Sequence, residues 1–227
     1  MSRSRLSRFL LLIVLPLLIS GCMSFRSDIH GSFKQESVTL TAREPVAVFF
    51  YFSHLEQSKG FDVVPKIILP RRGFKDILQE SMKQINNIKT FATFTDAYDD
   101  IDNVNRRRMR DSLKEANDYT VHVVIRREHS FAKHFLADLF AGSSLSVLPV
   151  AYSWEYIFTA HVTDRNGMKI KHYERTAQLE TWTQALLIFF YPFNPPEVKI
   201  EEIYLESLKD IFREIEADGV LAGKGKS

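Results

Sequence analysis

Apolar and polar residues along the chain follow short periods that predict alternating strands and helices. Residues 46–52 form a continuous apolar and aromatic run between a proline and a serine, which predicts a buried strand. Apolar residues then recur at helical spacing from Phe74 to Ile85 and predict an amphipathic helix that ends at about Asn87.

The same periodicity predicts the later elements of the body. We expect, in chain order, a short strand at 90–95, a more polar helix at 104–116 with Met109 and Leu113 facing inward, a strand at 119–126, a β-hairpin at 152–179 and a closing amphipathic helix at about 200–215.

The hairpin has the clearest pattern in the chain. Large apolar residues alternate with polar ones over 152–163, and Asn166-Gly167 is a strong turn signal because both residues tolerate positive φ. A two-residue loop would pair Arg165 with Met168, Trp154 with Leu179, Tyr156 with Ala177, Ala160 with Tyr173 and His161 with His172. A three-residue bulged loop that uses Asp164 and Gly167 is the alternative, and it would shift this register.

Together these elements predict one α/β (α+β) domain over residues 45–216. We expect a mixed sheet of about five strands in the order β-α-β-α-β-β-β-α, with the helices mainly on one face. Residues 22–44 are polar and aperiodic and predict a flexible tether, and residues 217–227 predict a disordered tail.

Two apolar inserts, at 131–150 and 182–196, flank the hairpin. The turn lies at Asn166-Gly167, so both inserts must emerge at the opposite end of the hairpin, close together. Their large apolar side chains make the candidate contact surface: Phe131, Phe135, Leu139 and Phe140 in the first insert, and Trp182, Leu186, Leu187, Phe189, Phe190 and Phe193 in the second.

Three interpretations of these inserts are open. They complete the hydrophobic core, or they form an exposed surface that docks on a membrane or on a partner subunit. A third possibility is that they rearrange into barrel strands, as the paired inserts of curli-type channels do. A membrane strand needs alternating character, and residues 186–193 do not alternate.

The first 22 residues have the three parts of a secretory leader. Arg3, Arg5 and Arg8 make a positive flank, and residues 9–19 are almost entirely apolar. This apolar run has about 11 residues, whereas a helix that crosses a bilayer needs roughly 20. We therefore expect residues 1–21 to be a signal peptide.

The sequence Ile19-Ser20-Gly21-Cys22 resembles the lipobox of bacterial lipoproteins. The resemblance implies cleavage between Gly21 and Cys22, a diacylglyceryl group on the Cys22 thiol and an acyl chain, such as palmitate, on the new amino terminus. Two or more acyl chains make a stable membrane anchor. Met23 stands where lipoproteins of the inner membrane commonly carry Asp, so the resemblance implies the outer membrane and a periplasm-facing domain. Another bacterial membrane is the alternative.

Cysteine content and charge narrow the function classes. Cys22 is the only cysteine, so the chain can form no internal disulfide. Without the three leader arginines, 27 basic residues stand against 28 acidic ones, a net charge near −1. Residues 106–110 contain four arginines, but Asp102 and Asp111 lie on either side of them, which indicates a solvated helix face. No nucleic-acid partner is implied.

Candidate chemistry is sparse. No phosphate loop, nucleophile elbow, paired-cysteine site or zinc-protease motif is present, and no cofactor is implied. The predicted register places His161 opposite His172, with Glu174 nearby, and such a set can hold a divalent metal. Polar residues on a wet sheet face are the simpler interpretation, so we assign no metal ligand and no catalytic residue.

The element order, with Ala116-Asn117-Asp118-Tyr119 entering a strand, loosely resembles a group of α/β-sandwich envelope lipoproteins. These are related to curli-secretion, penicillin-binding-protein-activator and TolB amino-terminal domains. They act by binding and assembly, so the resemblance implies no catalytic residue, and it rests on fold-level analogy.

The sequence therefore predicts a lipoprotein that is not an enzyme. We expect it to be held on the membrane by lipid on Cys22 and to act as a binding or assembly factor for an envelope complex, with an envelope protein or a second copy as its partner. The alternative is a small envelope hydrolase or metal-dependent enzyme that uses the His161/His172 face.

Overall fold

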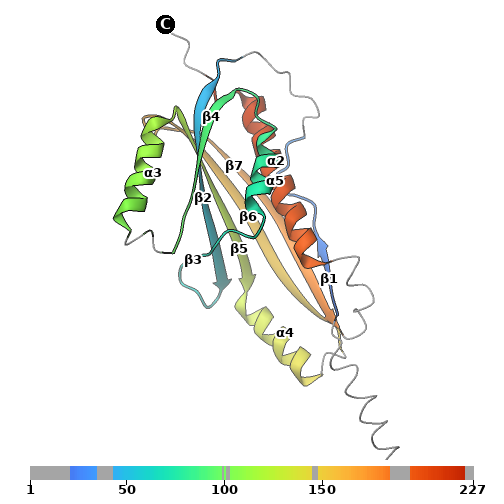
Figure 1. The fold of residues 1–227 in the computed structure, drawn as a ribbon. Coiled ribbons are helices and arrows are strands. Elements are labelled where there is room, and N and C mark those ends of the chain that lie inside the picture. Colours follow the sequence, from blue (N-terminus) through green and yellow to red (C-terminus); the bar gives the residue numbers. More distant parts are fainter. Residues whose placement is uncertain are drawn as a thin grey trace, which may run out of the picture.

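The fold is an open, mixed β-sheet with two helices packed on one face (Figure 1). The computed structural model describes residues 21–34, 43–98, 100, 103–144, 148–184 and 195–222. Seven strands form the sheet, and four helices accompany it in these ranges. The predicted α/β class with a mixed sheet is confirmed, with more strands than the five expected.

The sheet has the order β1-β7-β6-β5-β2-β3, and β4 pairs with β2 beside this path. The strands are β1 (Gly21–Arg26), β2 (Val46–Lys59), β3 (Lys66–Ile67), β4 (Ile88–Thr95), β5 (Tyr119–Ser130), β6 (Val150–Asp164) and β7 (Lys169–Gln184). Strand β2 runs parallel to β4 and β5, and the other pairs are antiparallel. Strands β1 and β3 are the two that the periodicity did not predict.

The core lies between the sheet and helices α2 (Phe74–Met82) and α5 (Pro196–Asp218). Phe50 of β2 packs against Phe212 of α5 at 5.5 Å between ring centroids, and Phe52 packs against Phe74 at 5.1 Å. Burial of each such side chain contributes up to about 1.5–3 kcal/mol. The apolar sides of both helices therefore pack against the same face of the sheet.

Two predicted helices differ from the expectation in detail. Helix α2 ends at Met82 instead of Asn87, because the amides of Gln84 and Ile85 bond three residues back and tighten the last turn. Helix α3 (Val104–Ala116) has the predicted bounds but lies over the other face of the sheet, near β4 (Figure 1). Met109 is exposed there, because α3 approaches the sheet through Arg106 and Arg110, whose guanidinium groups lie over aromatic rings.

The hairpin has the register predicted from a two-residue loop, but its turn is the alternative loop of three residues. Trp154 faces Leu179 and His161 faces His172, as expected. The Gly167 amide donates to the Asp164 carbonyl, and the Asp164 amide donates to the Met168 carbonyl, so the loop has three residues. A bulge between Val162 and Thr163 compensates for the extra loop residue and restores the register along the rest of the hairpin.

The prediction of a flexible tether over residues 22–44 is wrong for residues 22–34. Residues 21–26 form β1 beside β7, and residues 27–34 continue across α5, where the Phe33 amide donates to Asp210 at 2.8 Å. This segment is polar and short, and long-range pairing with β7 gives it a structure that its own periodicity does not indicate. Residues 35–42 lie outside the described residues.

The predicted disordered tail also differs from the structure. Helix α5 extends to Asp218, and Gly219 ends it in the left-handed conformation, with φ of 68°. Leu221 is 1% exposed in the core, and its carbonyl accepts a hydrogen bond from Asn87. Burial of one leucine thus orders the chain beyond the helix, to the end of the described residues at 222.

Candidate docking surface at the Cys22 end of the sheet

One end of the sheet collects the features that the sequence singled out. Cys22 pairs with Thr183 of β7, and Thr183 pairs with Val150 at the start of β6. Strand β5 ends at Ser130 and leads directly into helix α4 (Phe131–Ser143), which extends beyond the strands at this end (Figure 1). We call this the Cys22 end; the turn at 165–167 marks the opposite end.

Helix α4 contacts the sheet through its polar side. His134 lies against the rings of Tyr152 and Trp154, and its Nε2 is 3.1 Å from the Ser153 carbonyl oxygen. The Tyr152 hydroxyl donates to Asp138 at 2.9 Å. Ala137, on the same side, is 8% exposed. The helix is therefore docked on the domain by a histidine, an aspartate and a small residue.

The large apolar side chains of α4 point away from the domain. The outer face of α4 consists of Phe131, Phe135, Leu136, Leu139 and Phe140, which are 38%, 56%, 50%, 57% and 59% exposed. The helical part of the first insert is therefore not core. This is the reverse of an ordinary surface helix, which buries its apolar stripe and exposes its polar residues.

The second insert is described only at its ends. Trp182 is half-buried within β7, between Ala151 of β6 and Met23 of β1, so it belongs to the sheet. Leu186, Leu187, Phe189, Phe190 and Phe193 lie outside the described residues.

A loop that the sequence analysis did not single out adds to the outer face of α4. Phe61, Val63 and Val64, between β2 and β3, are 67%, 94% and 67% exposed. The Phe61 ring stacks on Phe131 at 4.9 Å between centroids. The sequence does contain a signal for this exposed apolar loop, because two adjacent valines lie between a glycine and a proline.

Asp62 holds this loop in shape. Its carboxylate accepts from the Ser58 amide at 2.9 Å and pairs with Lys66 at 2.6 Å. These bonds, with Lys66 first, lower the pKa of Asp62. The one acidic side chain of the loop is thus turned back to its base, while the apolar residues around it point outward.

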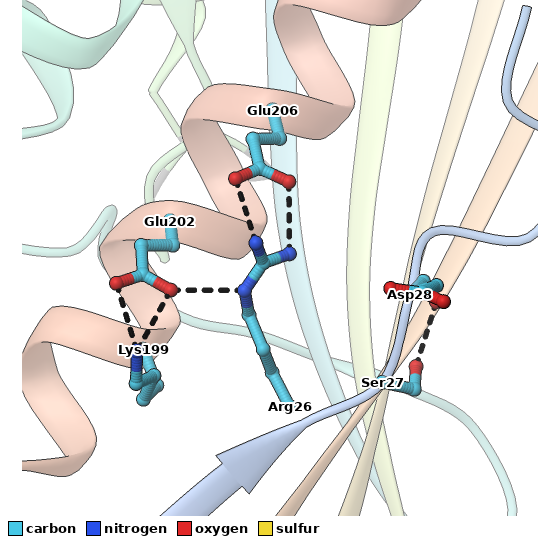
Figure 2. Close-up of polar contacts among 6 residues, drawn as sticks. All are labelled: Arg26, Ser27, Asp28, Lys199, Glu202 and Glu206. Carbon is cyan, nitrogen blue, oxygen red and sulfur yellow. Dashed lines mark hydrogen bonds and ion pairs between the residues drawn. The ribbon is translucent and has the colours of Figure 1, made fainter. Parts of the chain in front are cut away.

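Arg26 fixes the chain that follows Cys22. Its Nε donates to Glu202 at 2.9 Å, and its two terminal nitrogens donate to the two oxygens of Glu206 at 2.8 and 2.7 Å (Figure 2). Lys199 also binds Glu202, and Lys199 followed by Arg26 lowers the pKa of that carboxylate. Because the guanidinium fork binds two glutamates of α5, the strand that begins at Gly21 has a defined position on the domain.

His161 and His172 lie opposite each other, as predicted, but few other metal-binding side chains of the described residues are near them. The Nδ1 atoms of His161 and His172 are 3.2 Å apart, and the Nε2 of His172 is 3.9 Å from Glu174. Partial burial, followed by the neighbouring His172 and Lys169, lowers the pKa of His161. Within the described ranges, no three His, Cys, Asp or Glu side chains are grouped so that they could hold a metal ion.

A second polar cluster, which the sequence analysis missed, joins β2, β4 and β5. Ser53 donates to Asp96 at 2.5 Å and lies 3.0 Å from the Nε2 of His122, while Tyr51 also donates to Asp96. The aspartate binds the serine and not the far nitrogen of the histidine, so it cannot orient the ring as it would in a catalytic triad. Burial lowers the pKa of His122 to about 4, which keeps the ring neutral.

A groove lies on the helix-covered side of the sheet, at its β4 edge. It has a volume of about 580 Å³ between α2 and β4. Its lining includes Leu78, Met82, Ile85 and Ile88, together with Phe91, which is 55% exposed. Within the described ranges β4 pairs only with β2, so its outer edge presents unpaired backbone groups beside an apolar groove.

Comparisons with known proteins assign no family. No family model matches the chain, and no curated protein matches it. Two solved structures that are similar are a single-substitution variant of the PelC dodecamer and the PelC dodecamer itself, both from Paraburkholderia phytofirmans. Their identities are 8% and 9%; each alignment covers 86% of this chain and 99% or 98% of the other, with a TM-score of 0.34. At this score the likeness carries no argument about function. No described helix is long and apolar enough to cross a membrane.

Proposed function

We propose that this protein is a lipoprotein of the outer membrane that faces the periplasm and serves as a non-enzymatic binding or assembly factor for an envelope complex. Lipid on Cys22 is the anchor, and the α/β domain is the part that binds. The leader with its lipobox-like cut site supports the anchor.

The observation that carries this proposal is the arrangement at the Cys22 end. The strand that begins at Gly21 runs beside β7, and α4 exposes its apolar outer face at the same end of the sheet. Soluble monomers rarely expose a contiguous apolar surface of this kind unless it meets a membrane or a partner. The arrangement supports a protein that works at a surface.

The groove at the β4 edge supports the binding role. An extended segment of a partner that pairs with β4 would gain backbone hydrogen bonds from the free edge. Its alternate side chains would enter the groove beside Leu78 and Phe91. An envelope protein or a second copy of the chain would bind in this way.

The anchor is tested by Cys22→Ser in the full chain. The substitution should abolish both labelling with radioactive fatty acid and cleavage of the leader, because no other cysteine is available. Normal processing and membrane retention of the variant would contradict the anchor.

The binding role is tested by Phe91→Asp. In intact cells, chemical crosslinking of the full chain should give one defined crosslinked species, and Phe91→Asp should abolish it. Met168→Asp is the matched control, because Met168 is 69% exposed but lies next to the hairpin turn. A species that Phe91→Asp and Met168→Asp leave equally intact would contradict the β4 edge as the binding surface.

A second candidate function is a metal-dependent hydrolase that uses His161 and His172. The 3.2 Å between their Nδ1 atoms is close to the spacing of two nitrogen ligands on one zinc ion, with Zn–N bonds of about 2.0–2.1 Å. Stoichiometric zinc binding by the purified chain, lost in the double variant His161→Ala/His172→Ala, would favour this function. The absence of tight zinc binding would leave the binding role as the better explanation.

A further inference from the structure

We infer that the outer face of α4 and the loop at 60–64 are buried together in the interfacial layer of a lipid bilayer. This inference rests on the proposed function, because the bilayer is the one that holds the lipid of Cys22. It adds a second membrane contact and a defined orientation of the domain to the anchor.

The polarity of α4 is reversed. The helix uses His134 and Asp138 to contact the domain and leaves Phe135 and Leu139 more than half exposed. A helix that is docked in water by its polar side would gain nothing from large apolar residues on the other side. An apolar environment outside the domain would bury these residues and so remove their apolar surface from water.

The length and charge of α4 suit the interfacial layer of a bilayer. Helix α4 has 13 residues, too few to cross a bilayer, but enough to lie in its interface with the apolar face submerged about 5–10 Å. Its two charged residues suit this position. Asp138 is bound by the Tyr152 hydroxyl, on the domain side, and Lys133 is an exposed cation that anionic headgroups attract.

A second element, the loop at 60–64, contributes to the same surface. Phe61 stacks on Phe131, so the loop at 60–64 and the start of α4 form one apolar surface. Val63 is 94% exposed, which leaves nearly the whole side chain available for lipid. Two contacts from distant parts of the chain define a plane, whereas a single helix would leave the domain free to rotate.

The position of β1 favours lipid over a protein as the occupant of this apolar surface. The strand that begins at Gly21 and contains Cys22 lies at this end of the sheet, and Arg26 fixes it to α5. Lipid attached to this strand would therefore hold this end of the sheet at the bilayer. The apolar surface must then lie against the membrane, with the turn at 165–167 pointing away from it.

The experiment measures the depth of single sites in the bilayer. The full chain, purified with its lipid, carries Leu139→Cys, Val63→Cys or the control Met168→Cys, labelled with an environment-sensitive fluorophore. Met168 is exposed like the other two but lies next to the hairpin turn, at the opposite end of the sheet. The proteins are placed in vesicles of phosphatidylethanolamine and phosphatidylglycerol that contain lipids with a nitroxide on the acyl chain.

Quenching of the fluorophore at 139 and 63, at least about threefold stronger than at 168, is the expected result, because the nitroxide quenches only at close range. Equal quenching at all three sites on vesicle-bound protein would overturn the inference. Disulfide crosslinks between two copies at residue 139 would also overturn it, in favour of self-association. Mass spectrometry of Cys22 separates these outcomes from failure of the proposed function, since an unmodified thiol there would refute the anchor itself.

Discussion

At the scale of single residues, His54 is a polar side chain buried in the core without hydrogen bonds from its ring to the described part of the chain. It is 1% exposed, and its ring lies edge-on to Phe74 at 4.6 Å and stacked against Tyr204 at 6.3 Å. Neither ring nitrogen has a hydrogen-bond partner among the described residues. Burial lowers the pKa of His54 to about 4, although Asp96 acts in the opposite direction. The folded protein therefore keeps this ring neutral.

His54 should make the fold sensitive to acid. Between pH about 6.5 and about 4 the unfolded chain binds a proton at His54 and the folded chain does not, so the free energy of unfolding falls as the pH is lowered through this window. The loss is about 3 kcal/mol at most. In His54→Leu, urea unfolding at several pH values should show a smaller loss, while His122 keeps a similar contribution. A pH dependence identical to that of the wild type would contradict this account.

At the scale of elements, the hairpin turn depends on backbone conformation more than on contacts. Gly167 has φ of 80°, and the nearest atom to an added Cβ would be the Lys114 Nζ at 4.0 Å. The Asp164 carboxylate accepts from the amides of Asn166 and Met168 and closes the loop. Space is available at Gly167, but an L side chain would be strained there.

Gly167→Ala should therefore destabilise the protein by about 1 kcal/mol, measured by urea unfolding. Gly142→Ala is the matched control. Gly142 lies inside α4, has no positive φ, and a Cβ there meets nothing within 4 Å. It should leave stability unchanged or raise the helix stability by about 0.5 kcal/mol. Equal effects of the two substitutions would refute the conformational explanation.

Also at the scale of elements, Arg26 connects β1 to α5. Arg26 binds Glu206 through two parallel hydrogen bonds and Glu202 through a third (Figure 2). Arg26→Ala should lower the hydrogen-exchange protection of the β1 amides about fivefold, which corresponds to about 1 kcal/mol. Arg26→Lys keeps the charge but not the fork and should give a smaller loss. Unchanged protection in Arg26→Ala would show that the pairing with β7 alone holds β1.

At the scale of the whole molecule, the domain has a covered face and an apolar end. Helices α2 and α5 bury one side of the sheet, whereas α4 and the loop at 60–64 expose apolar side chains at the Cys22 end (Figure 1). A surface that serves contact and not folding should tolerate charge without loss of structure.

Leu139→Asp should thus change the free energy of unfolding by no more than about 0.5 kcal/mol and leave the amide protection of α4 intact. Ala137→Asp, two residues earlier on the inward side, should release α4 from the sheet, because it buries a carboxylate without a partner. Hydrogen exchange of α4 in both variants measures the difference. Loss of protection in Leu139→Asp would mean that the outer face supports the fold.

Much of the fold was predictable where a local pattern and one buried face act together. The register of β6 and β7 follows from side-chain alternation, since a slip of one residue would turn Trp154 and Tyr156 to the other face. The turn type was open in the sequence, because Asp164 and Asn166-Gly167 support both loops. The cluster around Ser53 and Asp96 was not predictable, because 43 residues separate the two in the chain.

The sequence by itself determined the α/β class, the bounds of α3, the hairpin register and the apolar character of residues 131–140, since each depends on the period or composition of neighbouring residues. Only the tertiary structure decided that α4 turns its polar side inward, that the segment from Gly21 pairs with β7 and that the 60–64 loop joins α4. Helical periodicity shows that two faces differ, but not which one meets the protein. That depends on contacts such as those of His134 and Arg26, which lie far along the chain from their partners.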